Sequence, residues 1–186
     1  MSLVSDAAPQ LLTLAGYQQR AAATAEPRAY DLEYLVPGII GEVGELFGQR
    51  AKAHWHGWMP GKLGEQIVKE YGDICWMTAL LLHTRGIDYL DPAYPAAGGV
   101  RWGRMNPNHA LLSASQNVHL QWLMEEEGIS DSEKWMDESV SRLWRVLRAH
   151  CQDITGLPFQ DVLQANLEKL ASRAARGVLR GSGDDR

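Results

Sequence analysis

Four acidic residues occur in two pairs of equal spacing, and they are the side chains of this sequence best suited to chemistry. The stretch "GIIGEVGELFG", residues 38–48, contains Glu42 and Glu45, and "EYGD" contains Glu70 and Asp73. Residues three apart share one face of a helix, so each pair presents two carboxylates side by side. Carboxylate oxygens without histidine or cysteine form a ligand set that suits Mg²⁺ or Mn²⁺. The four acids are therefore predicted to hold a divalent metal ion.

The second pair lies at the start of a very apolar segment. From Ile74 to Leu82 the sequence is apolar all round, as in a central buried helix, and Glu70 and Asp73 point along its apolar stripe. Like charges brought together away from water are unfavourable unless a cation neutralises them or one carboxyl stays protonated. This environment favours a metal site over two pairs of solvated charges.

Proline and glycine residues divide the chain into about six helical segments, and alternating strand patterns are missing. We therefore expect an all-α helical bundle in one domain, residues 1–186, whose core helices lie in 9–87 and 157–176. The helices are predicted at 9–24, 37–53, 63–84, 110–127, 132–153 and 158–176. A long Gly- and Pro-rich loop is expected at 86–107, and a flexible tail at 177–186.

The helix predicted at 37–53 carries three glycines on one face. Each of Gly41, Gly44 and Gly48 costs about 0.5–1 kcal/mol relative to Ala in a helix interior, which suggests that another backbone approaches them closely. Antiparallel packing of this helix on the next one would bring the two acid pairs face to face across a narrow cleft. Replacement of Gly44 by Leu is accordingly predicted to damage folding or assembly.

Composition argues against two other classes of protein. A formal net charge of -5 disfavours a surface for duplex nucleic acid, which needs a net basic patch. The longest apolar stretch, "ICWMTALLL", is too short to span a bilayer, and the N-terminal residues lack the pattern of a signal peptide. Cys75 and Cys151 are far apart in the sequence and suit a reducing compartment. We expect a cytoplasmic protein that does not bind membranes.

The order ExxE, spacer, ExxD resembles the all-α nucleoside triphosphate pyrophosphohydrolases of the MazG and dimeric dUTPase type. The segments "GYQQRAAATA" and "VLQANLEKLASRAARGVLRGSGDDR" resemble the opening helix and the closing helix and tail of that superfamily. The resemblance covers residues 10–87 and 157–186 well, and the middle segment, 88–156, more weakly. It implies a Mg²⁺-dependent hydrolase that cleaves a nucleotide between its α and β phosphates, with the metal, Mg²⁺ or Mn²⁺, held by Glu42, Glu45, Glu70 and Asp73.

Further side chains can be given roles in such a reaction. One glutamate would act as general base toward water, and Glu45 is favoured, with Glu42 beside it. Asn166, Lys169 and Arg173 fall on one edge of the closing helix and are predicted to bind phosphate, with Lys62 from the spacer as an addition. A merely solvated edge is the alternative for these residues.

The base of a nucleotide is expected near "HWHGWMPGK", residues 54–62. Trp55 and Trp58 could stack on a base and His54 could hydrogen-bond its edge, while the resemblance adds Gln18 from the first helix. Capping of the hydrophobic core by the two tryptophans explains the same pattern.

The middle segment, 88–156, is either an insertion or a degenerate second copy. Residues 137–157 align with the segment from 69 onward, so that Trp144 falls on Trp76, Glu138 on Glu70 and Ser141 on Asp73. When residues 113–120 are aligned with the first acid pair, Gln116 takes the place of Glu42 and His119 that of Glu45. The alternative is two unrelated helices that share a Trp. A true copy would favour a homodimer over a tetramer.

Three function classes fit these patterns. The first is a pyrophosphohydrolase of dUTP, dCTP or a modified deoxynucleotide, which cleans the nucleotide pool. The second is an enzyme resembling phosphoribosyl-ATP pyrophosphohydrolase, and the third is a non-catalytic nucleotide-binding bundle. The four intact acids favour an enzyme.

Overall fold

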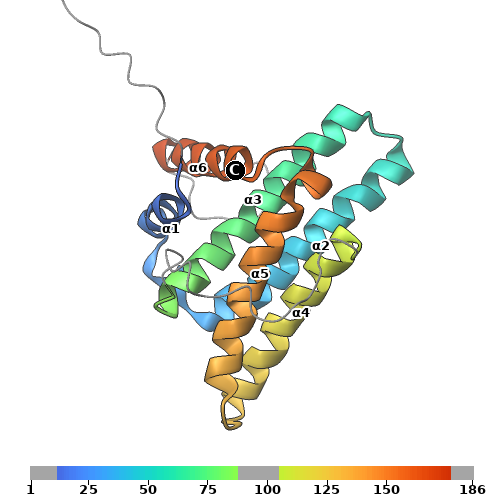
Figure 1. The fold of residues 1–186 in the computed structure, drawn as a ribbon. Helices are drawn as coiled ribbons and strands as arrows, with labels where there is room; N and C mark the ends of the chain where they lie inside the picture. Colours follow the sequence, from blue (N-terminus) through green and yellow to red (C-terminus); the bar gives the residue numbers. More distant parts are fainter. Residues whose placement is uncertain (1–11, 88–104, 177–186) are drawn as a thin grey trace, which may run out of the picture.

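The computed structural model describes residues 12–87 and 105–176, and every regular element in them is helical (Figure 1). This confirms the prediction of an all-α protein. The predicted tail, 177–186, and all but the ends of the predicted loop, 86–107, lie outside the described residues. In chain order the elements are α1 (Leu14–Ala23), the 3₁₀ helix η1 (Pro27–Tyr30), α2 (Leu32–His56), α3 (Pro60–Thr84), α4 (Pro107–Glu126), α5 (Ser132–Thr155) and α6 (Phe159–Ala175).

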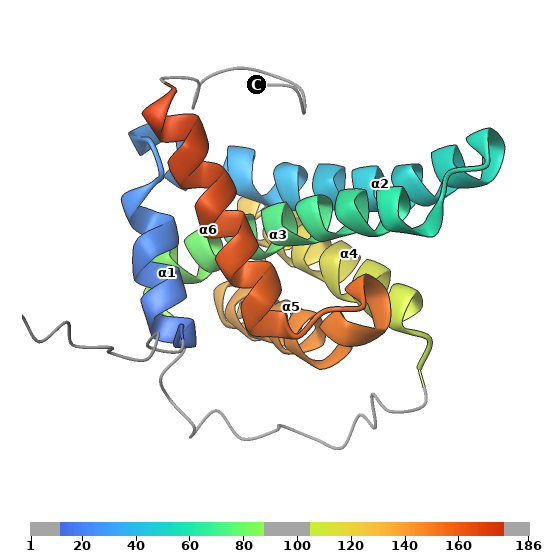
Figure 2. The same cartoon turned by 90° about the horizontal axis from the view of Figure 1, so that it is seen from above.

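Two helical hairpins form the body of the molecule (Figure 1). α2 and α3 make the first and α4 and α5 the second, and they pack with α2 against α4 and α3 against α5. α1 and α6 contact α3 and lie to one side of the hairpins (Figure 2). α3 therefore has neighbours on most of its surface, and Ile74–Leu82 is buried apart from the half-buried Trp76. This is the central helix that the apolar sequence predicted.

The starts of α1 and α2 differ most from the prediction, by five residues each. α2 begins at Leu32, so Pro37 lies inside the helix instead of at its first turn. The fully buried Leu35 and Ile39 on either side of Pro37 anchor this turn in the core, and their burial offsets the backbone hydrogen bond that proline cannot make. α1 begins at Leu14 because the Thr13 hydroxyl caps it by accepting the Gly16 N–H at 3.0 Å.

The glycine face of α2 points outward, so the predicted close neighbour is wrong for the described parts of the chain. A Cβ added at Gly41, Gly44 or Gly48 would meet no atom of another described residue within 4 Å. α2 uses its other face to reach the core and leaves this one open. Close approach occurs instead at Gly72, where an added Cβ would lie 3.0 Å from the Cβ of Asn166.

We expect Gly44→Ala to stabilise the protein by about 0.5–1 kcal/mol, because the methyl group meets open space and the unfolded chain loses conformational freedom. Urea denaturation measures this change. Gly72→Ala is the matched comparison and should destabilise the protein, since the new methyl group displaces Asn166. Equal loss of stability in both variants would show that the α2 face is covered after all.

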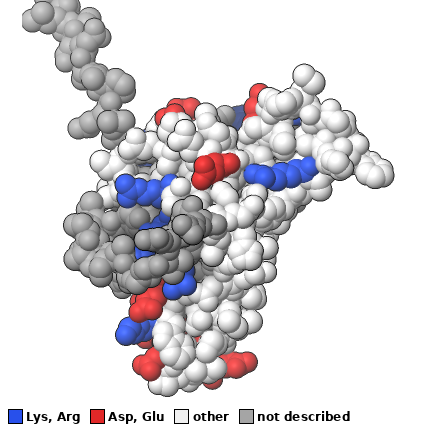
Figure 3. Space-filling view, turned by 45° about the vertical axis from the view of Figure 1, so that its right-hand side comes forward, with Lys and Arg blue, Asp and Glu red and all other residues white. Residues whose placement is uncertain are grey.

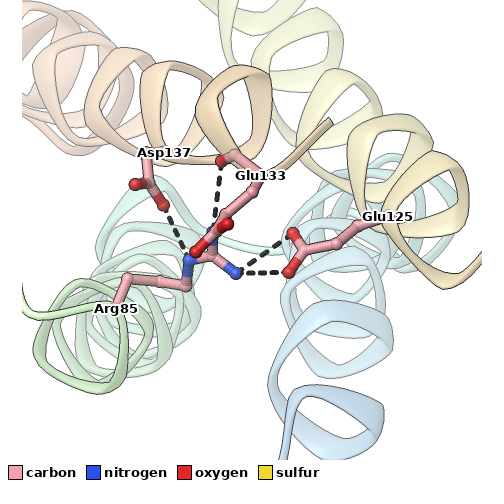
Figure 4. A network of polar contacts seen from close by, with 4 residues as sticks. All are labelled: Arg85, Glu125, Glu133 and Asp137. Carbon is pink, nitrogen blue, oxygen red and sulfur yellow. Dashed lines mark hydrogen bonds and ion pairs between the residues drawn. The ribbon is translucent and has the colours of Figure 1, made fainter. Parts of the chain in front are cut away.

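Arg85 ties the end of α3 to the second hairpin (Figure 4). Its Nη1 lies 2.7 and 3.0 Å from the two carboxylate oxygens of Glu125, and its Nε lies 2.7 Å from Asp137 Oδ1. Its Nη2 donates to the backbone oxygen of Glu133 at 3.1 Å. The Arg85 side chain is 9% exposed, so this network joins α3, α4 and α5 with little solvent screening at the arginine.

The proposed internal copy corresponds in space to the second hairpin. Its Trp144 is buried and stacks on Tyr17, whereas Trp76 is half-buried and donates its indole N–H to the Thr24 hydroxyl at 3.1 Å. Of the positions aligned with Glu70 and Asp73, Glu138 is exposed and Ser141 is buried. The repeat remains a prediction, since the two tryptophans have different surroundings.

Charged side chains of both signs are interspersed over a largely uncharged surface on the face shown in Figure 3. Within residues 12–87 and 105–176, no helix has the length and apolar character needed to cross a membrane. Cys75 and Cys151 are free and buried, and burial raises the pKa of each thiol, to about 11 for Cys151. Both thiols therefore act as packing groups.

Candidate metal centre

Three of the four predicted acids come together between α2 and α3. Glu42, Glu45 and Glu70 each offer a carboxylate oxygen, and these three oxygens lie within 4.8 Å of one another. Because α2 and α3 pack antiparallel, the three side chains lie at the same height along the hairpin. Glu70 is buried, Glu42 is half-buried and Glu45 is exposed, so the cluster runs from the core to the solvent.

The electrostatics of this cluster favour a cation. Burial raises the pKa of Glu42 to about 8, and the negative charges of Asp73, Glu45 and Glu70 add to the effect, while Lys169 opposes it. A bound divalent ion would relieve both the repulsion and the cost of burial. Three carboxylates without a histidine or thiolate are hard oxygen ligands, so these residues fit Mg²⁺ or Mn²⁺.

Asp73 lies beside the cluster but is engaged by α6. Its Oδ1 accepts a hydrogen bond from Asn166 Nδ2 at 3.0 Å, and its Oδ2 forms an ion pair with Lys169. Two of the three predicted phosphate-binding residues of α6 therefore lie at the acids. Arg173 is half-buried one turn further along the same helix.

A buried tyrosine extends this network to α1. Tyr17 is fully buried, and its hydroxyl donates to Asn166 Oδ1 at 3.0 Å. Burial raises the pKa of Tyr17 well above its ordinary value, so the hydroxyl stays protonated and remains a donor. Gly72 allows Asn166 to come this close to α3. Tyr17 was not predicted as a site residue, because nothing local in the sequence connects it to a residue 149 positions away.

Gln49 is a second site residue that was not predicted from the sequence. It lies one turn after Glu45 on α2, is 4% exposed, and its Nε2 donates to Glu70 Oε1 at 2.7 Å. A buried amide donor stabilises the ionised carboxylate and fixes its orientation. Its spacing in the sequence could have identified it, since Glu42, Glu45 and Gln49 follow one another at helical intervals.

We expect Gln49→Leu to weaken Mn²⁺ binding about 10- to 100-fold, because Glu70 loses the donor that orients it. Isothermal titration calorimetry with MnCl₂ measures this directly. Gln152→Leu, at an exposed position of α5, is the matched control and should bind Mn²⁺ like the parent. Unchanged Mn²⁺ affinity in a folded Gln49→Leu protein would remove Gln49 from the site.

Three of the predicted base-binding residues, and Lys62, which was predicted to bind phosphate, lie away from this cluster. His54 and Trp55 are in the last turn of α2, and Trp58 and Lys62 follow in the turn and the start of α3, where the Lys62 amine lies 4.3 Å from the Trp58 ring centroid. Helical rise puts Trp55 about 15 Å beyond Glu45. Both helices extend further than predicted, so these residues form the projecting tip of the hairpin (Figure 2).

Gln18 is the fourth residue that was predicted to contact the base. It is buried in α1, and its Nε2 donates to the backbone oxygen of Ile87 at 3.1 Å. This bond ties α1 to Ile87, two residues after Arg85, the C-cap of α3. Gln18 therefore serves the fold in this structure.

A hollow of about 450 Å³ lies between α3 and the connection of α5 to α6. On a helical wheel, its α3 residues Gly61, Gly64 and Val68 are opposite Glu70. The hollow is thus separate from the acid cluster and adds no residue to it.

No model of a known protein family matches this chain, and neither a curated protein nor a solved structure matches it. The likeness to pyrophosphohydrolases of the MazG and dimeric dUTPase type therefore stays a prediction. Interpretation of the site depends on its own chemistry.

Proposed function

We propose that the protein is a Mg²⁺-dependent nucleoside triphosphate pyrophosphohydrolase, which yields a nucleoside monophosphate and pyrophosphate. The observation that carries this proposal is the approach of three carboxylate oxygens to within 4.8 Å, beside an asparagine and a lysine of α6. Enzymes that transfer or hydrolyse phosphoryl groups use acidic residues to hold a metal ion and basic residues to bind phosphate. Mn²⁺ would serve in place of Mg²⁺.

A bound divalent ion would neutralise charge on the polyphosphate and make water a better nucleophile. Glu42, Glu45 and Glu70 would hold this ion, together with Asp73. Glu45, the exposed member of the cluster, faces the solvent from which water arrives and would accept its proton. The water oxygen bonds to the α phosphorus as the bond to the bridging oxygen breaks, and pyrophosphate leaves.

The basic edge of α6 would position the phosphates. Lys169 would contribute a mobile point charge, Arg173 a planar fork and Asn166 a hydrogen-bond donor. In the proposed role the substrate is a deoxynucleotide such as dUTP, dCTP or a modified analogue, whose removal protects the cytoplasmic nucleotide pool.

A homodimer forms part of the proposal. Trp55 is 83% exposed and Met59 is 75% exposed at the tip of the first hairpin. Large exposed apolar side chains that gather at one place favour burial against another surface. A second copy would cover them, and a tetramer would bury still more of this surface.

Pyrophosphate release from a panel of nucleoside and deoxynucleoside triphosphates and phosphoribosyl-ATP tests the proposal. With Mg²⁺ we expect release from at least one nucleotide, and EDTA should abolish it. Glu45→Gln and Asp73→Asn should reduce kcat/KM at least about 100-fold. Glu65→Gln, at an exposed position of α3, is the control and should keep parental activity.

The outcomes of this panel separate the remaining functions. Release from phosphoribosyl-ATP alone would identify the other pyrophosphohydrolase reaction. Binding of a nucleotide without metal-dependent release of pyrophosphate from any compound would contradict an enzymatic function.

A further inference from the structure

Each oxygen of the Asp73 carboxylate has a partner on α6 in this structure. Asn166 donates to one oxygen at 3.0 Å, and the Lys169 amine pairs with the other. The side chains of Lys169 and Asp73 are 20% and 17% exposed, so the ion pair is largely shielded from water. A divalent ion that takes Asp73 as a ligand must therefore contend with Lys169.

The two partners of Asp73, Asn166 and Lys169, are held in very different ways. Asn166 is fixed from behind by the Tyr17 hydroxyl at 3.0 Å and fits against Gly72. Lys169 carries its charge at the end of a flexible four-carbon chain and can move to another anion nearby. The amide of Asn166 can thus stay on Asp73 while the amine of Lys169 leaves it.

Lys169 is also within electrostatic reach of the glutamate cluster. The Asp73 carboxylate with which it pairs lies one turn from Glu70 on α3, so the Lys169 amine is near the acids that would hold the metal. Lys169 thus reduces the excess negative charge of the centre, as a metal ion would. Two cations at one partly buried site repel each other.

We propose that Lys169 is an internal counter-ion of the metal centre, which a divalent ion displaces from Asp73 and which then pairs with a phosphate group of the substrate. The proposal rests on the proposed function for the identity of that phosphate. Asn166, held by Tyr17, keeps Asp73 oriented during the exchange. Lys169 is then a positioning residue for the metal and a binding residue for the polyphosphate.

This arrangement predicts opposite effects from one substitution. Lys169→Met frees Asp73 and removes a competing charge, so Mn²⁺ should bind about tenfold more tightly in the absence of nucleotide. The same variant lacks the charge for phosphate, so inorganic pyrophosphate should bind about tenfold more weakly in the presence of Mg²⁺. Calorimetric titration of the full chain measures both affinities.

Three further variants define the mechanism. Lys169→Arg keeps the charge and should bind Mn²⁺ within about twofold of the parent. Lys69→Met makes the same change at an exposed position next to Glu70 in the sequence and should also leave Mn²⁺ affinity within about twofold. In an Asp73→Asn protein, addition of Lys169→Met should tighten Mn²⁺ binding less than about twofold, because the contact to be displaced is gone.

The inference is overturned if folded Lys169→Met protein binds Mn²⁺ no more tightly than the parent. It is equally overturned if the substitution tightens Mn²⁺ binding by the same factor in the Asp73→Asn background, which would indicate general repulsion. If the parent binds Mn²⁺ but hydrolyses no nucleotide, the proposed function alone fails. A parent protein that binds no Mn²⁺ overturns both.

Discussion

Replacement of Glu42 by Gln is expected to stabilise the metal-free protein and, at the same time, to abolish metal-dependent hydrolysis. The substitution removes a charge whose burial, close to three other acids, raises the pKa of Glu42 to about 8. After allowance for solvent screening we expect a gain of about 1–2 kcal/mol at pH 8, or about 2–8 °C in Tm. Loss of a metal ligand should lower kcat/KM at least about 1000-fold. Thermal unfolding in EDTA and pyrophosphate release measure the two effects.

The same carboxyl gives the metal-free parent a definite pH dependence. A folded-state pKa of about 8 means that the folded protein keeps a proton that the unfolded chain loses near its ordinary pKa. The stabilisation is complete below about pH 4.5 and is lost as the pH rises toward about 8. In EDTA the contribution of Glu42 should therefore fall between pH 5 and 8, and saturating Mg²⁺ should reduce this fall.

The difference in unfolding free energy between parent and Glu42→Gln isolates this contribution from other titrating groups. Glu138→Gln, at an exposed position of α5, is the matched control and should change stability by less than about 0.5 kcal/mol. If the parent and Glu42→Gln proteins show the same pH dependence in EDTA, the carboxyl is ionised in the folded protein. The electrostatic case for the metal centre would then be lost.

Arg85→Met is expected to cost about 2–4 kcal/mol, the largest loss of stability among the substitutions considered. Glu125 and Asp137 would lose a guanidinium that contacts them at 2.7 Å, and these acids, 26% and 31% exposed, would be left close together. Breaking a buried charge network by removing one partner costs about 3–5 kcal/mol, and the exposure of the acids reduces that value. A Tm lower by about 4–16 °C should result.

The activity of this variant discriminates a structural role from a functional one. Arg85 is at the far end of α3 from the turn with α2 and lies three helical turns beyond Asp73. Arg85→Met should therefore retain parental kcat/KM at temperatures where it is folded. Arg148→Met, at an exposed position of α5, is the control for loss of a charge. A stability loss in Arg85→Met no greater than that of Arg148→Met would show that the network contributes little.

The sequence by itself determined the helical character of this protein and the identity of its central helix. Apolar residues on every side of Ile74–Leu82 require neighbours all round, and the structure supplies them from α1, α2, α5 and α6. The ends of α5 and α6 were also close to their predicted positions, because capping depends on residues a few positions apart, whereas α1 and α2 begin five residues from the starts predicted at Pro9 and Pro37. The spacing of the four acids likewise follows from helical geometry alone.

Only the tertiary structure decided how these acids differ from one another. Glu42, Glu45 and Glu70 form the cluster, whereas Asp73 is paired with α6, and no local pattern distinguishes these cases. Gln49 acts across the hairpin, and its amide reaches Glu70 because of helix packing.

The surroundings of the α2 glycines and of the hairpin tip were also decided by the tertiary structure. Helical periodicity placed Gly41, Gly44 and Gly48 on one face, but which face packs depends on where the other helices lie. The Trp-rich segment is close to the acids in the sequence. Because α2 and α3 are both longer than predicted, Trp55 lies about 15 Å from Glu45 along the helix. Periodicity reports which side chains share a face of one helix. Their partners are chosen by the packing of helices that are distant in the chain, as in the hydrogen bond that joins Tyr17 to Asn166.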